Sequence, residues 1–333
     1  MNALGNPVPL SDARAALESA ARVSLRAPSV FNTQPWKWSI GGDLMRLSAD
    51  PARRLGVTDA GGRLLLLSCG GALHHVCVAL AAAGWRTEVE RLPDERRPDL
   101  LATVRVVGRG EPDPIAARLA GAISRRRTDR RAFGERRVPE ATLAQLAELV
   151  EAEGASLYVV PDGRVPELAV VVDEAADVEY FSAAHRTELT RWTHRPAWTG
   201  DGVPPATAVE PALRRVPARN LLPSGSPGLL AGAGEDDGAA YVIIFGAGDR
   251  PLDLLRGGEA MSALLLRATV EGISTAPISE AVEVAWPREL LGRLLPGGRG
   301  EPYLIVRLGY VDSDEVLPVS PRREVREAVV FDE

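Results

Sequence analysis

The sequence contains little cysteine, histidine or lysine. Its 333 residues include two cysteines, four histidines and a single lysine, Lys37. Two cysteines, Cys69 and Cys77, are too few for a disulfide framework or a cysteine zinc site, and both are expected to be buried thiols. The histidines have no ligand-like spacing to carboxylates. The sequence therefore predicts neither a metal centre nor a Ser-His-Asp triad.

Long apolar runs and an excess of positive charge are also absent. Acidic residues outnumber basic ones by 45 to 39, so the formal net charge is −6, which argues against a general nucleic-acid binder. No uninterrupted apolar run reaches the roughly 18 residues of a membrane span. Residues 1–10 lack the basic-then-apolar pattern of a signal peptide. We therefore expect a cytoplasmic protein without nucleic-acid or membrane partners.

The common nucleotide-binding signatures are missing as well. No Gly-x-Gly-x-x-Gly follows a predicted strand, so no dinucleotide-binding half is indicated. The single lysine does not belong to a Gly-x-x-x-x-Gly-Lys loop, which excludes P-loop chemistry. No Gly-x-Ser-x-Gly elbow is present. Two polar clusters remain as candidate functional sites.

Periodicity and the placement of Gly and Pro predict alternating helices and strands. Helices are expected at residues 10–27, 63–83, 114–124, 139–153, 166–192 and 252–271. Strands are expected at residues 36–40, 87–92, 101–107, 156–160, 241–245 and 303–310, with a polar tail at 312–333. Ser11 is a suitable N-cap for the first helix. Residues 193–237 are rich in Pro and Gly, which is typical of a lid or of a flexible insertion.

One spacing occurs twice. Residues 70–87 and residues 258–275 share the pattern Gly-x-Ala followed by Gly-x-x-Thr, each on a predicted helix that ends at a glycine. The match could arise by chance, because Gly and Ala are frequent in this chain. Duplication would instead give an α+β fold with two related halves, which we predict at residues 11–115 and 116–333.

The first polar cluster is the loop Pro28–Trp36, between a predicted helix and a predicted strand. Its prolines limit the backbone, while Asn32 and Gln34 each offer a donor and an acceptor. Such a loop suits the edge of a flat heterocycle that carries carbonyl and NH groups. The alternative is that both amides only satisfy nearby backbone groups.

The second polar cluster lies in the charged run Arg125–Arg131. Guanidinium groups of Arg126, Arg127 and Arg130, with the hydroxyl of Thr128, match the geometry of a phosphate. The alternative is a solvated linker between the halves, because nearly every basic residue of the chain is arginine.

Several segments resemble the FMN-dependent nitroreductase superfamily. Residues 27–36 are similar to its Ala-Pro-Ser-x-x-Asn-x-Gln-Pro-Trp segment, and residues 126–130 to its Arg-Arg-Ser-x-Arg segment. Residues 272–278 resemble its Gly-Leu-x-x-x-Pro segment. Residues 307–310 and 321–323 resemble its closing strand and basic tail. The resemblance thus covers nearly the whole chain.

The order of these segments differs from that of an ordinary nitroreductase, which begins with the arginine segment. Here the N-terminus lacks that segment, and residues 139–235 lack a second Pro-Ser-Asn loop. In the family, each FMN lies at a homodimer interface between the arginines of one subunit and the loop of the other. The resemblance therefore implies the Acg-like branch: two fused halves that imitate the homodimer, one FMN per chain, and a monomer for which further dimerisation stays open.

The resemblance also implies cofactor-binding residues from both halves. They are Pro28, Ser29, Asn32, Gln34, Arg126, Arg127, Thr128, Arg130, Pro277, Ile278, Ser279 and Arg322. Arg126, Arg130 and Arg322 would neutralise the phosphate. Asn32 and the backbone around Ser29 would bind the pyrimidine edge of the ring.

The remaining predicted residues would lie beside the faces of the flavin ring. Pro277 and Ile278 would press on one face and leave the other open to substrate. Ser279 takes the place of the acidic residue that often follows Pro-Ile in the family. No side chain is expected to be catalytic, because flavin N5 carries the chemistry, and no metal is implied.

The resemblance implies an oxidoreductase that transfers electrons from NAD(P)H to a nitroaromatic compound, a quinone or a similar small acceptor by a ping-pong scheme. If residues 193–237 close over the ring, the chain would instead sequester FMN or sense redox state with little turnover. A flavin-free relative acting as a structural module is the third possibility.

Overall fold

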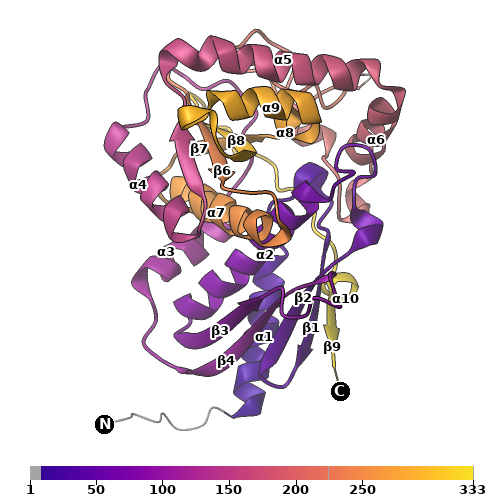
Figure 1. Cartoon of the computed structure of the whole chain (residues 1–333), viewed down its shortest axis with the longest axis vertical. Coiled ribbons are helices and arrows are strands. Elements are labelled where there is room, and N and C mark those ends of the chain that lie inside the picture. Colours follow the sequence, from indigo (N-terminus) through magenta and orange to yellow (C-terminus); the bar gives the residue numbers. More distant parts are fainter. Residues whose placement is uncertain (1–8, 224, 333) are drawn as a thin grey trace.

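The computed structural model describes residues 9–223 and 225–332, and its elements form two sheets with helices between them (Figure 1). The first half contains α1 (Leu10–Ser24), β1 (Trp36–Gly41), β2 (Leu44–Ala49), α2 (Arg63–Ala82), β3 (Trp85–Arg91) and β4 (Leu100–Arg109). Its strands lie in the order β3-β4-β2-β1 and are antiparallel. The C-terminal strand β9 (Val329–Phe331) extends this sheet, parallel to β1.

The second half follows the connecting helix α3 (Pro114–Ile123). It contains α4 (Glu140–Ala152), β5 (Ser156–Val159), α5 (Val165–Phe181), α6 (Ala183–Thr193), β6 (Ala240–Gly246), α7 (Pro251–Val270), β7 (Ser274–Ile278), α8 (Glu280–Glu283), α9 (Ala285–Leu294), β8 (Glu301–Gly309) and α10 (Val325–Ala328). Short 3-10 turns lie at Val30–Asn32, Pro51–Arg53, Asp162–Arg164, Ala197–Thr199, Pro205–Thr207 and Pro296–Gly298. Its antiparallel sheet has the order β5-β6-β8-β7.

The two halves repeat the same strand order. β3-β4-β2-β1 in the first sheet corresponds to β7-β8-β6-β5 in the second, and the long helix α2 or α7 precedes the matching edge strand. Each of these helices ends before a glycine with positive φ, Gly84 or Gly272. The α+β architecture of two related halves, expected from the repeated spacing, is therefore confirmed.

The repeated glycines lie where α2 crosses α7, between the two sheets (Figure 1). A Cβ atom on Gly70 would lie 2.0 Å from a backbone carbonyl oxygen of α7, and one on Gly258 would lie 2.0 Å from a carbonyl oxygen of α2. Four residues further along each helix, His74 Nδ1 and Ser262 Oγ are 2.9 Å apart. Matching positions thus meet each other, as at the twofold interface of a homodimer.

The halves differ most at the hairpin between their inner strands. In the first half a tight turn at Gly42, with φ +58°, joins β1 to β2. In the second half residues 160–239 separate β5 from β6, and this insertion contains α5, α6 and the segment 193–237. Two helices replace the single one expected at 166–192, because Ser182 accepts a hydrogen bond from the backbone N–H of His185 and caps α6.

Two expectations at the chain ends are wrong. Ser11 does not cap α1, which begins at Leu10 with Pro9 in the N-cap position. The polar tail contains regular structure: α10 leads into β9, whose Val329 pairs with Trp38 of β1. The second half therefore contributes a strand to the first sheet, and the division at residue 115 stays a prediction.

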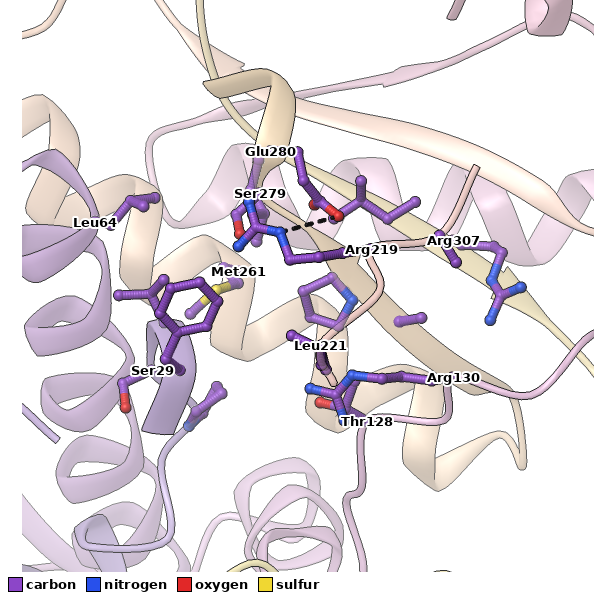
Figure 2. A pocket seen from close by; sticks show the side chains of 18 of the residues that line it. Ser29, Leu64, Thr128, Arg130, Arg219, Leu221, Met261, Ser279, Glu280 and Arg307 are labelled. Carbon is purple, nitrogen blue, oxygen red and sulfur yellow. Dashed lines mark ion pairs between the residues drawn. The ribbon is translucent and has the colours of Figure 1, made fainter. Parts of the chain in front are cut away.

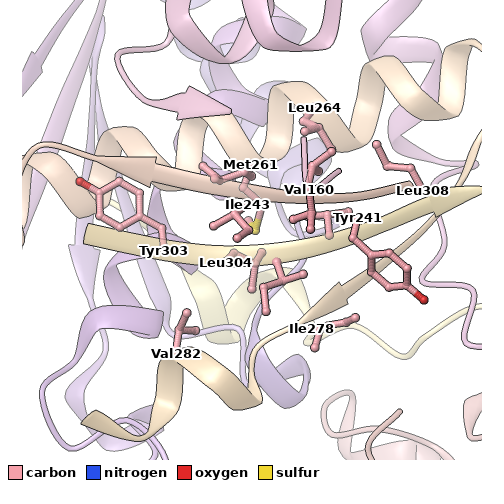
Figure 3. Packing of buried hydrophobic residues seen from close by; sticks show 14 of the residues in the cluster. Val160, Tyr241, Ile243, Met261, Leu264, Ile278, Val282, Tyr303, Leu304 and Leu308 are labelled. Atoms are coloured by element: carbon pink, nitrogen blue, oxygen red, sulfur yellow. The ribbon is translucent and has the colours of Figure 1, made fainter. Parts of the chain in front are cut away.

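Buried apolar side chains fill the space between helices and sheets. In the second half Ile243 and Leu304 of the sheet belong to the same buried cluster as Met261 and Leu264 of α7 (Figure 3). α2 has the length and hydropathy of a membrane span, but it is largely buried and serves as a core helix. On this helix Cys69 is fully buried, as expected, whereas Cys77 is half-buried. Burial raises the pKa of the Cys77 thiol to about 12.

Candidate active and cofactor site

A cavity lies where the two halves and the segment 193–237 meet (Figure 2). The loop after α1 and the start of α2 line it from the first half, and the end of β7, α7 and β8 line it from the second. Most of these side chains are apolar, such as Phe31, Leu64 and Met261. A few polar groups, among them Ser29 and Thr128, converge on the same space. This composition is typical of a site for a small organic molecule.

A smaller cavity adjoins this one, hereafter the ring-sized cavity, and shares Ser29, Thr128 and Arg130 with it while adding Asn32, Arg126 and Arg322. A third cavity shares Arg126 and Arg322 with the smaller one and adds Arg26 and Arg127. The predicted site residues that line the three cavities are Pro28, Ser29, Asn32, Arg126, Arg127, Thr128, Arg130, Pro277, Ile278, Ser279 and Arg322. The fold thus brings together segments that are up to about 290 residues apart in sequence.

The arginine end of the site carries uncompensated positive charge. Among the described residues, Arg126, Arg127 and Arg322 form no ion pair. Arg126 is 6% exposed, and its Nε and Nη1 atoms have no hydrogen-bond acceptor. Burial, followed by repulsion from Arg127 and Arg130, lowers the pKa of Arg126 to about 10, and burial with repulsion from Arg126 lowers that of Arg322 to about 9. A dianionic phosphate would relieve this repulsion and supply the missing acceptors. The residues present therefore fit an FMN phosphate.

Arg130 lies nearer the ring-sized cavity than Arg126 does. It lines both that cavity and the adjoining one, and its Nη1 donates to the carbonyl oxygen of Thr207 at 3.2 Å. Burial lowers the pKa of Arg130 to about 10, and Glu280 is the strongest of the charges that oppose this shift. Figure 2 shows Arg130 and Thr128 opposite Ser29 across the cavity.

The loop after α1 has an unusual backbone. Phe31, Asn32 and Gln34 have φ values of +46°, +55° and +50°, which non-glycine residues rarely adopt. The hydroxyl oxygen of Ser29 accepts a hydrogen bond from the backbone N–H of Gln34 at 2.9 Å and closes the loop. Such strained positions persist where the surroundings fix them, and they are common at ligand sites.

The side-chain amides of Asn32 and Gln34 form hydrogen bonds to other parts of the protein. Asn32 Nδ2 donates to the carbonyl oxygens of Gly202 and Pro321, and its Oδ1 accepts from Arg322 at 3.0 Å. Gln34 does not line the cavity: Nε2 donates to Gly200 and Oε1 accepts from the backbone of residue 323. The alternative interpretation of both amides, as partners of backbone groups, is therefore correct for Gln34. A contact between Asn32 and a ligand stays a prediction, at the arginine end of the site.

The segment 193–237, hereafter the lid, is anchored to both halves. Near its start, Asp201 pairs with Arg53 of the first half at 2.8 Å, and near its end Asp236 pairs with Arg307 of β8 at 2.6 Å. Both aspartates have side chains at most 1% exposed. Between these anchors an apolar cluster packs lid residues on Phe31. Described residues of this segment, among them Val216, Arg219 and Leu221, therefore line the cavity while ion pairs fix the segment near both ends.

Sequence patterns missed three charged residues that line the cavity, one of which is Arg307 of β8, the partner of Asp236. Glu280 is 4% exposed and lies one residue beyond Ser279, the position at which the resemblance implied an acidic residue. Arg219 comes from the lid, and its Nε lies 3.3 Å from Glu280 Oε1 (Figure 2). The acidic residue two positions after Ile278 was a usable signal, whereas nothing in the Pro- and Gly-rich lid distinguished Arg219.

The symmetry-related second site is filled. α4 and β5 are joined by residues 153–155, which leaves no room for a counterpart of the loop after α1. Position 259, next to Gly258, corresponds to Gly71 next to Gly70, and carries a glutamate. Glu259 forms a two-bonded ion pair with Arg91 at 2.7 and 2.8 Å, and its side chain is 2% exposed. A buried ion pair therefore stands at the position where the first half has a glycine.

Sequence comparison relates the chain to two proteins of Mycobacterium tuberculosis strain H37Rv. It is 37% identical over 329 residues to "Putative NAD(P)H nitroreductase Rv3131", and the alignment covers 93% of this chain and 90% of that protein. It is 32% identical over 314 residues to "Putative NAD(P)H nitroreductase acg", with 93% and 94% covered. The chain belongs to the Acg-like branch of the nitroreductase family. No family model matches this Acg-like sequence.

Among solved structures, the FMN-dependent nitroreductase NfnB of Mycobacterium smegmatis in complex with NADPH is similar to the Acg-like chain. The match has 16% identity and a TM-score of 0.42, and it covers 66% of this chain and 100% of that one. The Acg-like chain has the α+β nitroreductase fold as two fused halves, which the resemblance of its sequence segments implied.

Proposed function

We propose that this chain binds one FMN between its halves and carries electrons from NAD(P)H to a small acceptor such as a nitroaromatic compound or a quinone. The arginine cluster at one end of a mainly apolar cavity carries this proposal. It combines a site for a phosphate with a site for a flat ring. The names of the two mycobacterial relatives agree with this reaction class.

Different side chains would bind the phosphate and the ring of the cofactor. Arg126 and Arg322 hold the phosphate, supported by Arg127. Arg130 is suited to stabilise negative charge on the reduced ring, and Thr128 offers a hydroxyl beside it. When bound, FMN supplies hydride transfer at ring atom N5. The protein contributes binding, orientation and the electrostatic environment of that chemistry.

One face of the ring site is formed by Pro277 and Ile278 at the end of β7. The opposite space, toward lid residues such as Val216 and Leu221, is where NAD(P)H and the acceptor would bind in turn. A shared space leads to a ping-pong order and needs no separate dinucleotide-binding domain. The two fused halves make one such site in a single chain, so a monomer is sufficient for function.

A second candidate function follows from the anchored lid. The buried ion pairs of Asp201 and Asp236 hold the cover in place from both ends. A cover that stays closed would exclude NAD(P)H and large acceptors while retaining the flavin. The chain would then sequester FMN or report on redox state with little turnover.

The visible spectrum of the purified protein under anaerobic NAD(P)H tests these functions. A reductase shows flavin absorption that disappears on addition of NADH or NADPH and returns when 1,4-benzoquinone is added. Flavin absorption that persists with both reductants supports sequestration. A colourless protein that takes up no added FMN contradicts both functions.

A further inference from the structure

Three buried carboxylates surround the single lid arginine that lines the ring cavity. Arg219 Nη2 lies 2.8 Å from Glu179 Oε1 and 2.5 Å from Glu283 Oε2, and its Nε lies 3.3 Å from Glu280 Oε1. The side chains of all four residues are at most 14% exposed. Glu179 comes from α5, whereas Glu280 and Glu283 lie one turn apart on α8.

The charges of this cluster do not balance without a bound proton. One guanidinium cannot neutralise three carboxylates in a buried place, so one carboxyl group is expected to be neutral. Glu283 Oε1 is buried and has no hydrogen-bond partner. Glu179 and Glu283 both contact the same atom, Arg219 Nη2, so a proton on Glu179 would supply a donor beside Glu283. Burial raises the pKa of Glu179 to about 10, and Arg219 only partly opposes this shift.

The cluster lies between two cavities. Glu280 and Ser279 line the ring cavity. Glu283 lines a second, polar cavity on its other side, whose rim includes the exposed residues Gly61 and Pro251. Ser279 precedes Glu283 by one turn of α8, and its backbone oxygen accepts a hydrogen bond from the Glu283 N–H at 3.2 Å. The carboxyl pair and the Ser279 hydroxyl group therefore lie in series between a surface cavity and the ring site.

We propose that Glu179 and Glu283 hold a proton and deliver it through Ser279 to the acceptor in the ring cavity. This inference rests on the proposed reductase function, which supplies the hydride. An acceptor carbonyl that receives a hydride, which is one proton with two electrons, becomes an oxyanion. The Ser279 O–H bond breaks as the new O–H bond of the product forms. Ser279 regains a proton from the carboxyl pair, and water in the polar cavity restores the pair.

Charges of both signs face this pair. Arg219 from the lid contacts both members of the pair, and Glu280 from α8 contacts Arg219. Asp59, before α2, lies in the polar cavity, and burial together with Glu283 raises the pKa of Asp59 to about 6. Arg63 and Arg288 line the same cavity with positive charge. We therefore expect Asp59 to be ionised and Glu179 to keep its proton at neutral pH.

Infrared spectroscopy of the flavin-free protein at pH 7 tests the bound proton directly. The wild-type protein should show the C=O stretch of a protonated carboxyl group. Glu179→Gln and Glu283→Gln should each lose it, because the new amide donates to the remaining carboxylate. Ser279→Ala and the control Glu174→Gln, an exposed carboxylate on the same helix as Glu179, should keep it. Absence of the band in the wild-type protein overturns the proposal.

Stopped-flow reoxidation tests the delivery. FMN-loaded protein is reduced with dithionite, which avoids any dependence on NAD(P)H, and mixed anaerobically with 1,4-benzoquinone. Ser279→Ala and Glu283→Gln should slow reoxidation at least about tenfold, since a positioned proton donor contributes about 10² or more. The solvent deuterium isotope effect on the reoxidation rate of the wild-type protein should disappear in Ser279→Ala. The control Glu174→Gln should reoxidise at the wild-type rate and with the wild-type isotope effect.

The outcomes separate the two proposals. Unchanged reoxidation rates in Ser279→Ala overturn the delivery path even if the infrared band is present. If wild-type protein binds no FMN or does not react with benzoquinone, the reductase function fails and the delivery fails with it. The infrared result would then still decide whether the carboxyl pair holds a proton.

Discussion

The two symmetry-related sites of this chain differ in shape and in charge. In the open site a Cβ atom on Gly71 would lie 3.3 Å from Met261 Cε, and Arg126 and Arg322 have no acidic partner among the described residues. In the filled site Glu259 stands at the corresponding position and pairs with Arg91. Fusion of two halves allows one site to be lost as long as the other is complete.

The comparison also shows how buried charge distinguishes a ligand site from a structural one. The Arg91–Glu259 pair is satisfied within the protein, so it needs no ligand. Arg126 has unpartnered donors, and repulsion from neighbouring arginines contributes to its lowered pKa. A buried cation without a counter-charge indicates an anionic ligand, whereas a paired one indicates packing.

The largest effect is expected at the helix crossing that both sites share. Gly70→Ala and Gly258→Ala each place a methyl group within 2.0 Å of a backbone carbonyl oxygen. Both should lower the free energy of unfolding by about 4 kcal/mol or more, and by similar amounts because the contacts are reciprocal. Urea denaturation measures this, with Gly121→Ala on α3, where a methyl group meets no atom, as control. Unequal losses would contradict the symmetric crossing.

Arg91→Ala should affect stability but not flavin binding. It leaves Glu259 buried without its partner and should cost about 3 kcal/mol in the free energy of unfolding. The double variant Arg91→Ala/Glu259→Ala should recover part of this loss, because the uncompensated charge is gone. FMN stoichiometry should stay that of the wild-type protein. A change in flavin content would show that the filled site still binds ligand.

Arg126→Ala should weaken flavin binding without lowering the stability of the flavin-free protein. We expect FMN binding to weaken by about 1.5–3 kcal/mol, the range for a hydrogen bond to a charged group. Stability of the flavin-free protein should not fall, because the change removes repulsion from Arg127 and Arg130. Fluorescence titration with FMN compares this variant with Arg125→Ala, an exposed neighbour. Equal affinity in both variants would rule out the phosphate assignment.

A smaller effect concerns the free energy of unfolding at acid pH, which depends on buried histidines that α2 carries and α7 lacks. Burial lowers the pKa of His74 to about 4 and that of His75 further, so both are neutral in the folded protein. An unfolded histidine titrates near pH 6.5, so stability is complete above that pH and falls as the pH decreases toward 4. The corresponding residues of α7 are Ser262 and Ala263. His75→Leu should reduce the pH slope of the free energy of unfolding, measured by urea denaturation, by up to about 1.4 kcal/mol per pH unit; an unchanged slope would contradict this origin.

Local patterns were sufficient for much of the fold. Glycines after helices, at 84 and 272, predicted where α2 and α7 end, and the repeated Gly-x-Ala spacing predicted two related halves. The arginine segment and the loop after α1 were also found, because their side chains form dense polar clusters in sequence.

Features that depend on long-range contacts could not be predicted. The pairing of β9 with β1 joins residues nearly 300 positions apart, and its short strand lies in a polar tail. Gln34 was expected to touch the cofactor, but its amide fixes residues 200 and 323, which only the folded lid and tail bring near. Arg219 could not be predicted as a cavity residue either, because only the folded lid brings it to the cavity.

The number of FMN molecules bound per chain tests the central claim most directly. Equilibrium dialysis of the flavin-free protein with FMN, combined with the solution mass from light scattering, measures it. One retained and one filled site predict one FMN per chain, including for the monomer. Two FMN molecules per chain, or binding only by a dimer with one FMN for two chains, would contradict the account.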